Sequence, residues 1–329
     1  MKKVLIISPN FQEDKCYEWI NLVKDASHFK NDVDFDYISP ETPISENVTL
    51  YDCLAIKEML CQTDLSKYEG LILIHGTEYI PFTAAALNLL LSHLEIPLVI
   101  ITQNALLSQK ANYRMECFNA AVTFILCNRV PGVYAVIKNE LSKTLEVHYG
   151  SRISQKAPFD FQYIDMDSGR FGDIVNDSFQ FKHGSINPSI KEMKNMTRRM
   201  SDMKKAANIM FIRSYRRMPY HYYNFAQSKP DAVLQELFDV TTILNNEGLN
   251  SLTAFSAHCK QYDVPLYLCP LVHEDLDYEE ILKPILHNGA ILIKNNTVFT
   301  TYAKLVYGYG DGKYKSYLDA NYTFEDFTK

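Results

Sequence analysis

The chain has 329 residues, which is enough for two domains of ordinary size and a substantial core. Hydrophobic residues make up 47% of it and charged residues 22%, as in globular proteins, and the net charge of −6 argues against a nucleic-acid-binding surface. No apolar run is long enough to cross a membrane, and the start MKKVLIISPN has the pattern of a first strand, not of a signal peptide.

The sequence carries no sign of a bound metal or cofactor. The seven cysteines are scattered without a CxxC pair, so neither a zinc site nor a disulfide framework is indicated. Reduced thiols in a cytoplasmic protein are the simplest interpretation. There is no GxGxxG motif, no P-loop and no paired spacing of metal ligands. We therefore expect no metal and no cofactor.

The first half alternates short apolar runs with segments of helical spacing, which predicts an α/β fold with a buried, doubly wound sheet. The predicted elements, in order, are strands at Val4–Ile7 and Asp34–Ile38 with a helix Glu18–Ala26 between them, a helix Tyr51–Leu60, a strand Leu71–Ile74, a helix that includes Thr83 and Leu90, a strand Ile96–Thr102, a helix around Cys117–Phe124, and a strand Gly132–Ile137 that pairs with the segment after Asn139.

The pattern dissolves after the first half and then restarts as a second α/β alternation. We expect a domain over 1–170, a linker over 171–205 and a second domain over 206–329. The predicted elements of the second domain are strands Asn208–Ile212, Val240–Leu244, Pro265–Cys269 and Gly289–Lys294, and helices Ala232–Phe238, Leu252–Lys260, Tyr278–Leu286 and Thr297–Tyr307.

The stretch Gly70–Leu90, GLILIHGTEYIPFTAAALNLL, reads as strand, turn and helix and places its turn at the carboxyl end of a buried strand. Ligands bind at this position in open α/β sheets. The helix that follows favours negative charge at its N-terminus. Gly76 lets the backbone approach a ligand closely, and Thr77 brings a hydroxyl.

HGTEYIPFTAAAL resembles the HGTDTMxETAxxL signature of L-asparaginases and related glutaminases. Near the C-terminus, NGAILIKNNTVFTTYAKLVYGYG resembles that family's GVIxGGDMTxEAALAKLxYLL, with Thr297 placed as a helix N-cap. The two matches lie in the family's order. The resemblance implies a larger N-terminal doubly wound domain and a smaller C-terminal α/β domain. It also implies an amidohydrolase.

The resemblance implies catalytic roles for three residues. Thr77 and Glu78, which stands where the family has aspartate, would form a triad with a lysine. The family's lysine position falls on Gly150, so Lys156 is the candidate, with surface exposure as its alternative. Arg152 stays charged and cannot act as a base.

The family's nucleophilic threonine falls on Phe11, which has no hydroxyl, and the following segment is too short for the family's lid loop. Cys16 is either a substitute nucleophile or a structural thiol.

Substrate-binding candidates are Asn10, Gly76, Ser45 and Glu46. Ser45 and Glu46 have an alternative role as the N-cap and first-turn charge of the next helix.

The resemblance further implies a homodimer or homotetramer, in which the loop Asn245–Gly248 would complete a neighbouring site. Three functions remain open: an asparaginase-like amidohydrolase with a rearranged site, an inactive homologue that binds a small amino acid or serves as a partner subunit, and a doubly wound protein with unrelated chemistry.

Overall fold

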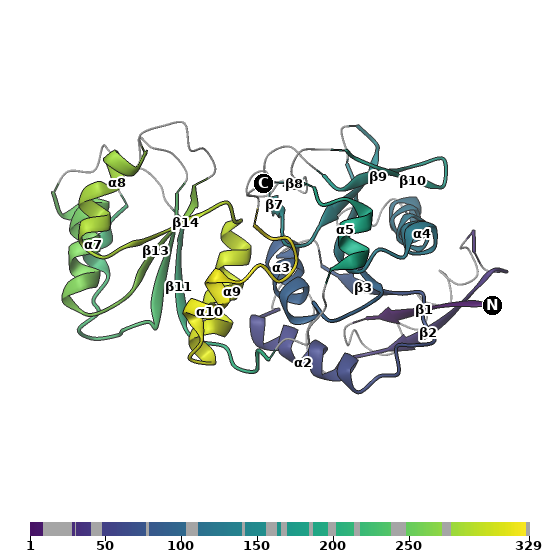
Figure 1. Ribbon diagram of the computed structural model, residues 1–329, viewed down its shortest axis with the longest axis horizontal. Helices are drawn as coiled ribbons and strands as arrows, with labels where there is room; N and C mark the ends of the chain where they lie inside the picture. Colours follow the sequence, from purple (N-terminus) through teal and green to yellow (C-terminus); the bar gives the residue numbers. More distant parts are fainter. Residues whose placement is uncertain are drawn as a thin grey trace. The chain divides into compact units, whose positions relative to one another are not determined.

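The computed structural model describes residues 1–8, 28–29, 31–40, 48–76, 79–102, 111–139, 142–155, 163–165, 170–183, 187–196, 202–213, 218–237, 248–271 and 278–326. The chain forms two compact units (Figure 1). The first contains Met1–Asp202 and takes back Tyr322–Phe324 from the C-terminal end, and the second begins at Met203. No helix in the described ranges is long and apolar enough to span a membrane.

The first unit is built on an eight-stranded sheet with the order β10-β9-β6-β5-β4-β3-β1-β2. Strands β1 to β5 are parallel, and β6, β9 and β10 join by antiparallel pairing. The strands are β1 (Lys2–Ile7), β2 (Val33–Ile38), β3 (Gly70–His75), β4 (Pro97–Thr102), β5 (Gly132–Lys138), β6 (Leu145–Tyr149), β9 (Gly172–Val175) and β10 (Ser178–Phe181), with β7 (Ile153–Gln155) and β8 (Tyr163–Asp165) as a separate hairpin.

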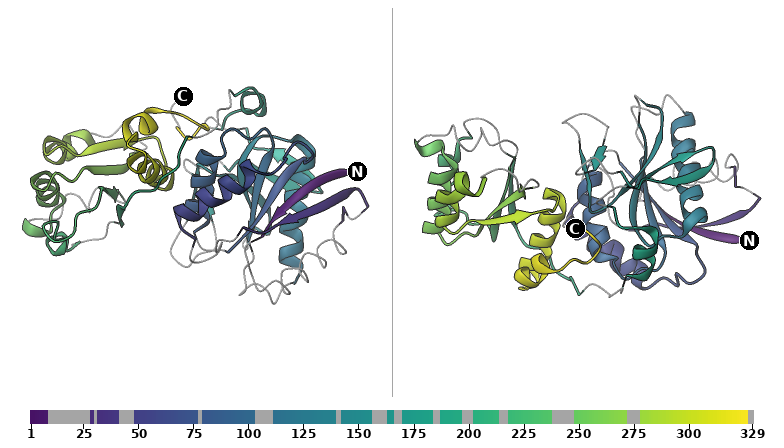
Figure 2. Two further views of the ribbon diagram at one scale, coloured as in Figure 1. Left: turned by 90° about the horizontal axis from the view of Figure 1, so that it is seen from below. Right: turned by 45° about the horizontal axis from the view of Figure 1, so that its top comes forward.

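Helices cover both faces of this sheet, which explains why its central strands are continuous apolar runs. Every residue of β3 and β4 is buried. α4 (Ala111–Asn128) packs its aromatic and aliphatic side chains on one face, and α3 (Ile80–Leu90), next to α2 (Leu50–Cys61), covers the other (Figures 1 and 2). A short helix, α5 (Ile190–Asn195), follows the last strand of the unit. The predicted helix Glu18–Ala26 lies outside the described residues.

The structure differs from the predicted linker over 171–205, because residues 172–181 form β9 and β10 at the edge of the large sheet. These strands are held by buried charges. Arg170 pairs with Asp173, with Nη2 donating to Oδ2 at 3.0 Å, and lies 3.6 Å from Glu146 Oε1 on β6. His148 lies 3.4 Å from the same carboxylate. The polar composition that suggested a linker is therefore part of an ionic cluster between neighbouring strands.

The second unit is a four-stranded parallel sheet with the order β11-β12-β13-β14. One face packs against α7 and α8, and α9 contacts the sheet on β11, β12 and β13. The elements are β11 (Ile209–Arg213), η2 (Tyr220–Tyr222), β12 (Ala232–Glu236), η3 (Gly248–Asn250), α7 (Leu252–Gln261), β13 (Leu266–Leu271), α8 (Tyr278–His287), β14 (Ile291–Lys294), α9 (Val298–Gly310) and α10 (Tyr314–Asp319).

The predicted helix at Ala232–Phe238 is wrong, because residues 232–236 form the inner strand β12. Ala232, Val233 and Leu234 are all fully buried, and a strand buried on both faces is not distinguished from a helix by periodicity. The predicted N-cap at the start of α9 is confirmed, since the Thr297 hydroxyl accepts a hydrogen bond from the backbone N–H of Thr300 at 3.1 Å. The predicted strand Val240–Leu244 lies outside the described residues.

Candidate functional site

The order of the parallel strands defines where a ligand would bind in the first unit. β1 is followed by β2 on one side, and the chain then crosses to place β3 on the other side of β1. The carboxyl ends of β1 and β3 therefore flank a topological switch point, where open α/β sheets bind ligands. Ser8 follows β1 there, and His75 ends β3.

His75 fixes the turn that follows β3. Its side chain is buried, with Nδ1 2.7 Å from the carbonyl oxygen of Gly76 and Nε2 2.9 Å from the Thr83 hydroxyl. A carbonyl can only accept, so Nδ1 donates, and Nε2 of the neutral ring accepts from the hydroxyl. His75 thus joins the start of the turn to the first turns of α3. With both ring nitrogens engaged, it acts as a positioning residue.

The N-cap residue of α3 provides no side-chain cap for the helix. The N-cap residue is Tyr79, which has a left-handed backbone (φ 62°, ψ 11°) and makes no capping hydrogen bond with its side chain. Pro81 stands in the first turn, which contains no acidic residue. The first N–H groups of a helix have no partner within the helix, and together with the helix dipole they favour a carboxylate or a developing oxyanion at such an end, although Pro81 itself contributes no N–H. A bulky residue with positive φ is strained, so this turn is held by its surroundings.

The predicted catalytic residues Thr77, Glu78 and Lys156 lie outside the described residues, as do Asn10, Ser45 and Glu46. Phe11 and Cys16 lie outside them too. Gly76 is described, and its carbonyl accepts the hydrogen bond from His75. The geometry on both sides of Thr77 and Glu78 is therefore defined, from His75 before them and from Tyr79 after them.

The alternative role of Ser45 and Glu46 as helix cap and first-turn charge is wrong. The N-cap of α2 is Thr49, whose hydroxyl accepts from the backbone N–H of Asp52 at 3.4 Å. The Asp52 carboxylate in turn accepts from the Thr49 backbone N–H at 2.7 Å. This reciprocal pair is a capping box.

Gly150, the position to which the family's lysine was assigned, has no room for a side chain. A Cβ atom there would lie 2.9 Å from the carbonyl oxygen of Val133 and 3.0 Å from that of Ala84. Both contacts are with backbone, which cannot move aside cheaply. The sequence has glycine at this position, and the packing around it would not accept a lysine side chain.

Arg152 is buried and anchors the C-terminal segment, a role that the sequence analysis missed. Its Nε and Nη2 atoms donate to the carbonyl oxygen of Phe324 at 3.0 and 2.6 Å. Tyr149 donates to the carbonyl of Thr323 at 2.6 Å, and Asn88 donates to the Thr323 hydroxyl at 2.9 Å. No local pattern in the sequence indicates a pairing between residues so far apart in the chain.

Burial disfavours the reactive thiolate form of the buried cysteines in the described ranges. Burial raises the pKa of the Cys117, Cys259 and Cys269 thiols to about 12, and burial also raises the pKa of Cys53. These thiols stay protonated near neutral pH, whereas the thiolate is the reactive form. In the part of the chain that the structure describes, no group of three or more His, Cys, Asp or Glu side chains could hold a metal ion.

Strand order, switch point and helix N-terminus define the first unit as a doubly wound α/β unit of the kind that binds a small ligand at the end of its strands. The family model of the asparaginase N-terminal domain (Asparaginase, N-terminal) matches residues 8–187, more than half of the chain. The chain therefore belongs to the asparaginase family, and its fold is that of an asparaginase-like amidohydrolase.

Solved structures share this fold over nearly the whole chain. L-asparaginase I from Vibrio cholerae O1 biovar eltor is similar with a TM-score of 0.74 at 14% identity, covering 100% of both chains. The thermostable L-asparaginase from Thermococcus kodakarensis gives 0.72 at 14%, covering 99% of this chain and 100% of that one. A probable cytoplasmic L-asparaginase from Campylobacter jejuni gives 0.67 at 13%, covering 97% and 99%. Comparison with functionally curated proteins finds no match.

Proposed function

We propose that the protein is an amidohydrolase that acts on the amide of an amino acid or a short peptide through a rearranged asparaginase site. The observation that carries the proposal is the clamp between His75 and Thr83 at the switch point. His75 precedes Thr77 and Glu78 in the chain, and Thr83 belongs to α3, the helix that follows them and whose N-cap residue makes no capping hydrogen bond with its side chain.

In the proposed reaction the hydroxyl oxygen of Thr77 attacks the amide carbon while a base takes its proton. The negative charge that develops on the amide oxygen is stabilised by N–H groups at the helix N-terminus. Ammonia leaves with a proton, and water then hydrolyses the ester to release the acid. Lys156 is the candidate base, because Arg152 is always charged and donates to Phe324.

Substrate binding in this proposal uses groups around the same turn. Glu78 pairs with the α-ammonium of the substrate, and Gly76 gives its backbone room. Asn10, Ser45 and Glu46 supply further polar contacts. Release of ammonia from a panel of amino-acid and peptide amides tests this function. If the protein hydrolyses none of these amides, the proposed function is wrong.

The second candidate is an inactive homologue that binds a small amino acid or serves as a partner subunit. Phe11 at the family's nucleophile position and the closed packing around Gly150 favour it. Under this alternative, the protein binds amino acids but hydrolyses none of the amides in the panel.

We also propose that the protein is a homo-oligomer and that it is located in the cytoplasm. The Campylobacter structure is described as a probable cytoplasmic L-asparaginase.

A further inference from the structure

A pocket in the second unit is lined by residues that all belong to that unit. It has a volume of about 310 Å³ and lies where α7 ends and β13 begins, beside the end of α8. Its floor is apolar, with Cys259, Val264, Pro265 and Leu266 among the lining residues. The volume is at the lower end of the range for small-molecule sites.

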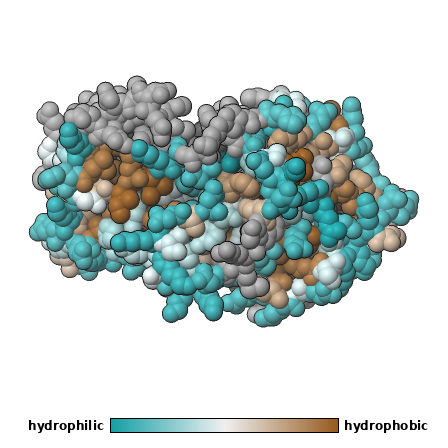
Figure 3. Space-filling model, viewed as in Figure 1, coloured by the Kyte–Doolittle hydropathy of each residue, from teal (hydrophilic) through white to brown (hydrophobic). Residues whose placement is uncertain are grey.

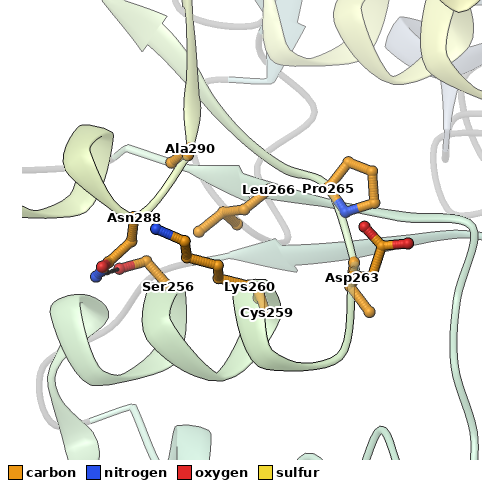
Figure 4. Close-up of a pocket in the computed structure, with 10 residues that line it drawn as sticks. Ser256, Cys259, Lys260, Asp263, Pro265, Leu266, Asn288 and Ala290 are labelled. Carbon is orange, nitrogen blue, oxygen red and sulfur yellow. Dashed lines mark hydrogen bonds between the residues drawn. The ribbon is translucent and has the colours of Figure 1, made fainter.

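Opposite charges stand at the two ends of this pocket. Figure 4 shows Lys260 extended toward Asn288 and Ala290, and Asp263 at the other end beside Pro265. No ion pair joins either side chain to another residue in the described ranges. An ammonium and a carboxylate that do not pair with each other can each bind the opposite charge of a ligand.

Asn288 adds an acceptor near Lys260. Its Nδ2 donates to the Ser256 hydroxyl at 2.9 Å and toward the Thr253 carbonyl at 3.4 Å, which fixes the amide with Oδ1 as the atom left to accept. Ser256 itself donates to the Thr253 carbonyl at 2.7 Å. One wall of the pocket therefore offers an ammonium and an amide oxygen side by side.

We propose that this pocket binds an elongated zwitterion of dipeptide size, with an apolar side chain over the floor. The ligand carboxylate pairs with Lys260, and its ammonium pairs with Asp263. The neighbouring peptide N–H donates to Asn288 Oδ1. Because Lys260 and Asp263 lie at opposite ends of the pocket (Figure 4), a ligand that pairs with both needs charges that are separated along its length, as those of a dipeptide are by a peptide unit.

Calorimetric titration with alanyl-leucine tests the proposal. Lys260→Gln and Asp263→Asn should each weaken binding at least tenfold, about 1.4 kcal/mol. Both residues are exposed, and asparagine tolerates the left-handed backbone of Asp263 (φ 52°), so the variants should fold. Lys229→Gln and Asp319→Asn, exposed positions outside the pocket, are matched controls and should bind as the wild type does.

Ligand analogues identify which charge meets which residue. Lys260→Gln should not alter the affinity for the C-terminal amide of alanyl-leucine, and Asp263→Asn should not alter it for the N-acetyl form. Two other zwitterions are titrated for comparison. 6-Aminohexanoate has separated charges but lacks the peptide N–H, and leucine carries both of its charged groups on one carbon atom. Both should bind more weakly than the dipeptide. Absence of dipeptide binding, or binding that neither substitution weakens, would overturn the proposal, and tighter binding of 6-aminohexanoate or leucine would overturn the assignment of a peptide.

Discussion

At the residue scale, the turn depends on a hydrogen bond between two buried side chains, His75 and Thr83. The family signature contains both residues, so the sequence indicated their importance. It did not show that they pair with each other, because the pairing depends on how β3 and α3 are placed relative to each other in the folded unit. The left-handed Tyr79 was not predicted either, since tyrosine rarely adopts that conformation.

Thr83→Val tests this clamp. Valine has nearly the same shape but no hydroxyl, so Nε2 of His75 loses its donor in a buried environment, and the free energy of unfolding should fall by about 1–3 kcal/mol. Thr83→Ser should retain most of the stability. Urea titration measures both. The control is Thr253→Val on the exposed side of α7. An equal loss in Thr83→Val and the control would show that the hydroxyl does not stabilise the turn.

At the element scale, the central parallel strands and most helices could be predicted from apolar runs and caps. The errors came where tertiary context decides. β12 is short and buried on both sides, so its residues fit a helix equally well. β9 contains a buried carboxylate, Asp173, whose charge is met by Arg170 and Lys182, which lie just outside β9 and β10.

The ionic cluster between β6 and β9 should make stability depend on acid pH. Burial opposes ionisation of Asp173, but hydrogen bonds and charge from Arg170 and Lys182 outweigh it, so the pKa of Asp173 is lowered. A carboxyl group with a lowered pKa stabilises the fold above its unfolded pKa, near 4, and this contribution is lost as pH falls through the folded value.

The free energy of unfolding should therefore decrease as the pH is lowered through this range. Asp173→Asn should be less stable than the wild type at neutral pH and should show a shallower acid dependence. Denaturant titrations at a series of pH values measure this. Asp177→Asn, an exposed change in the β9–β10 turn, is the control. If the free energy of unfolding of Asp173→Asn depends on pH as steeply as that of the wild type, Asp173 does not cause the acid sensitivity.

At the scale of the whole molecule, the chain returns to its first unit at Tyr322–Phe324. Arg152→Met should cost about 1.5–3 kcal/mol of unfolding free energy, because it removes charge-assisted hydrogen bonds from a buried guanidinium to the carbonyl of Phe324. Arg129→Met is the matched control, since its pairing with Glu69 is on the surface and is worth about 0–1 kcal/mol. Urea titration of both variants compares them, and equal losses would contradict the anchoring role of Arg152.

The second unit has a strand edge without a partner strand among the described residues. β14 pairs with β13 along one edge, and no strand in the described ranges pairs with its other edge. Ile291 on β14 is 42% exposed, and Figure 3 shows hydrophobic residues gathered on this unit. We expect a dimer or a larger homo-oligomer, with the loop Asn245–Gly248 contributing to a neighbouring site. Sedimentation that shows only a 37.9 kDa species at micromolar concentration would contradict this.

The central claim is that the turn between His75 and Tyr79 carries out amide hydrolysis. The direct measurement is ammonia release from amino-acid and peptide amides by the wild type and by Thr77→Val. We predict that at least one amide is hydrolysed, that free asparagine is hydrolysed well below the usual enzyme rate of about 10 per second, and that Thr77→Val removes the activity while the variant stays folded. Ammonia release that is absent from every amide, or equal in the two proteins, would contradict the claim.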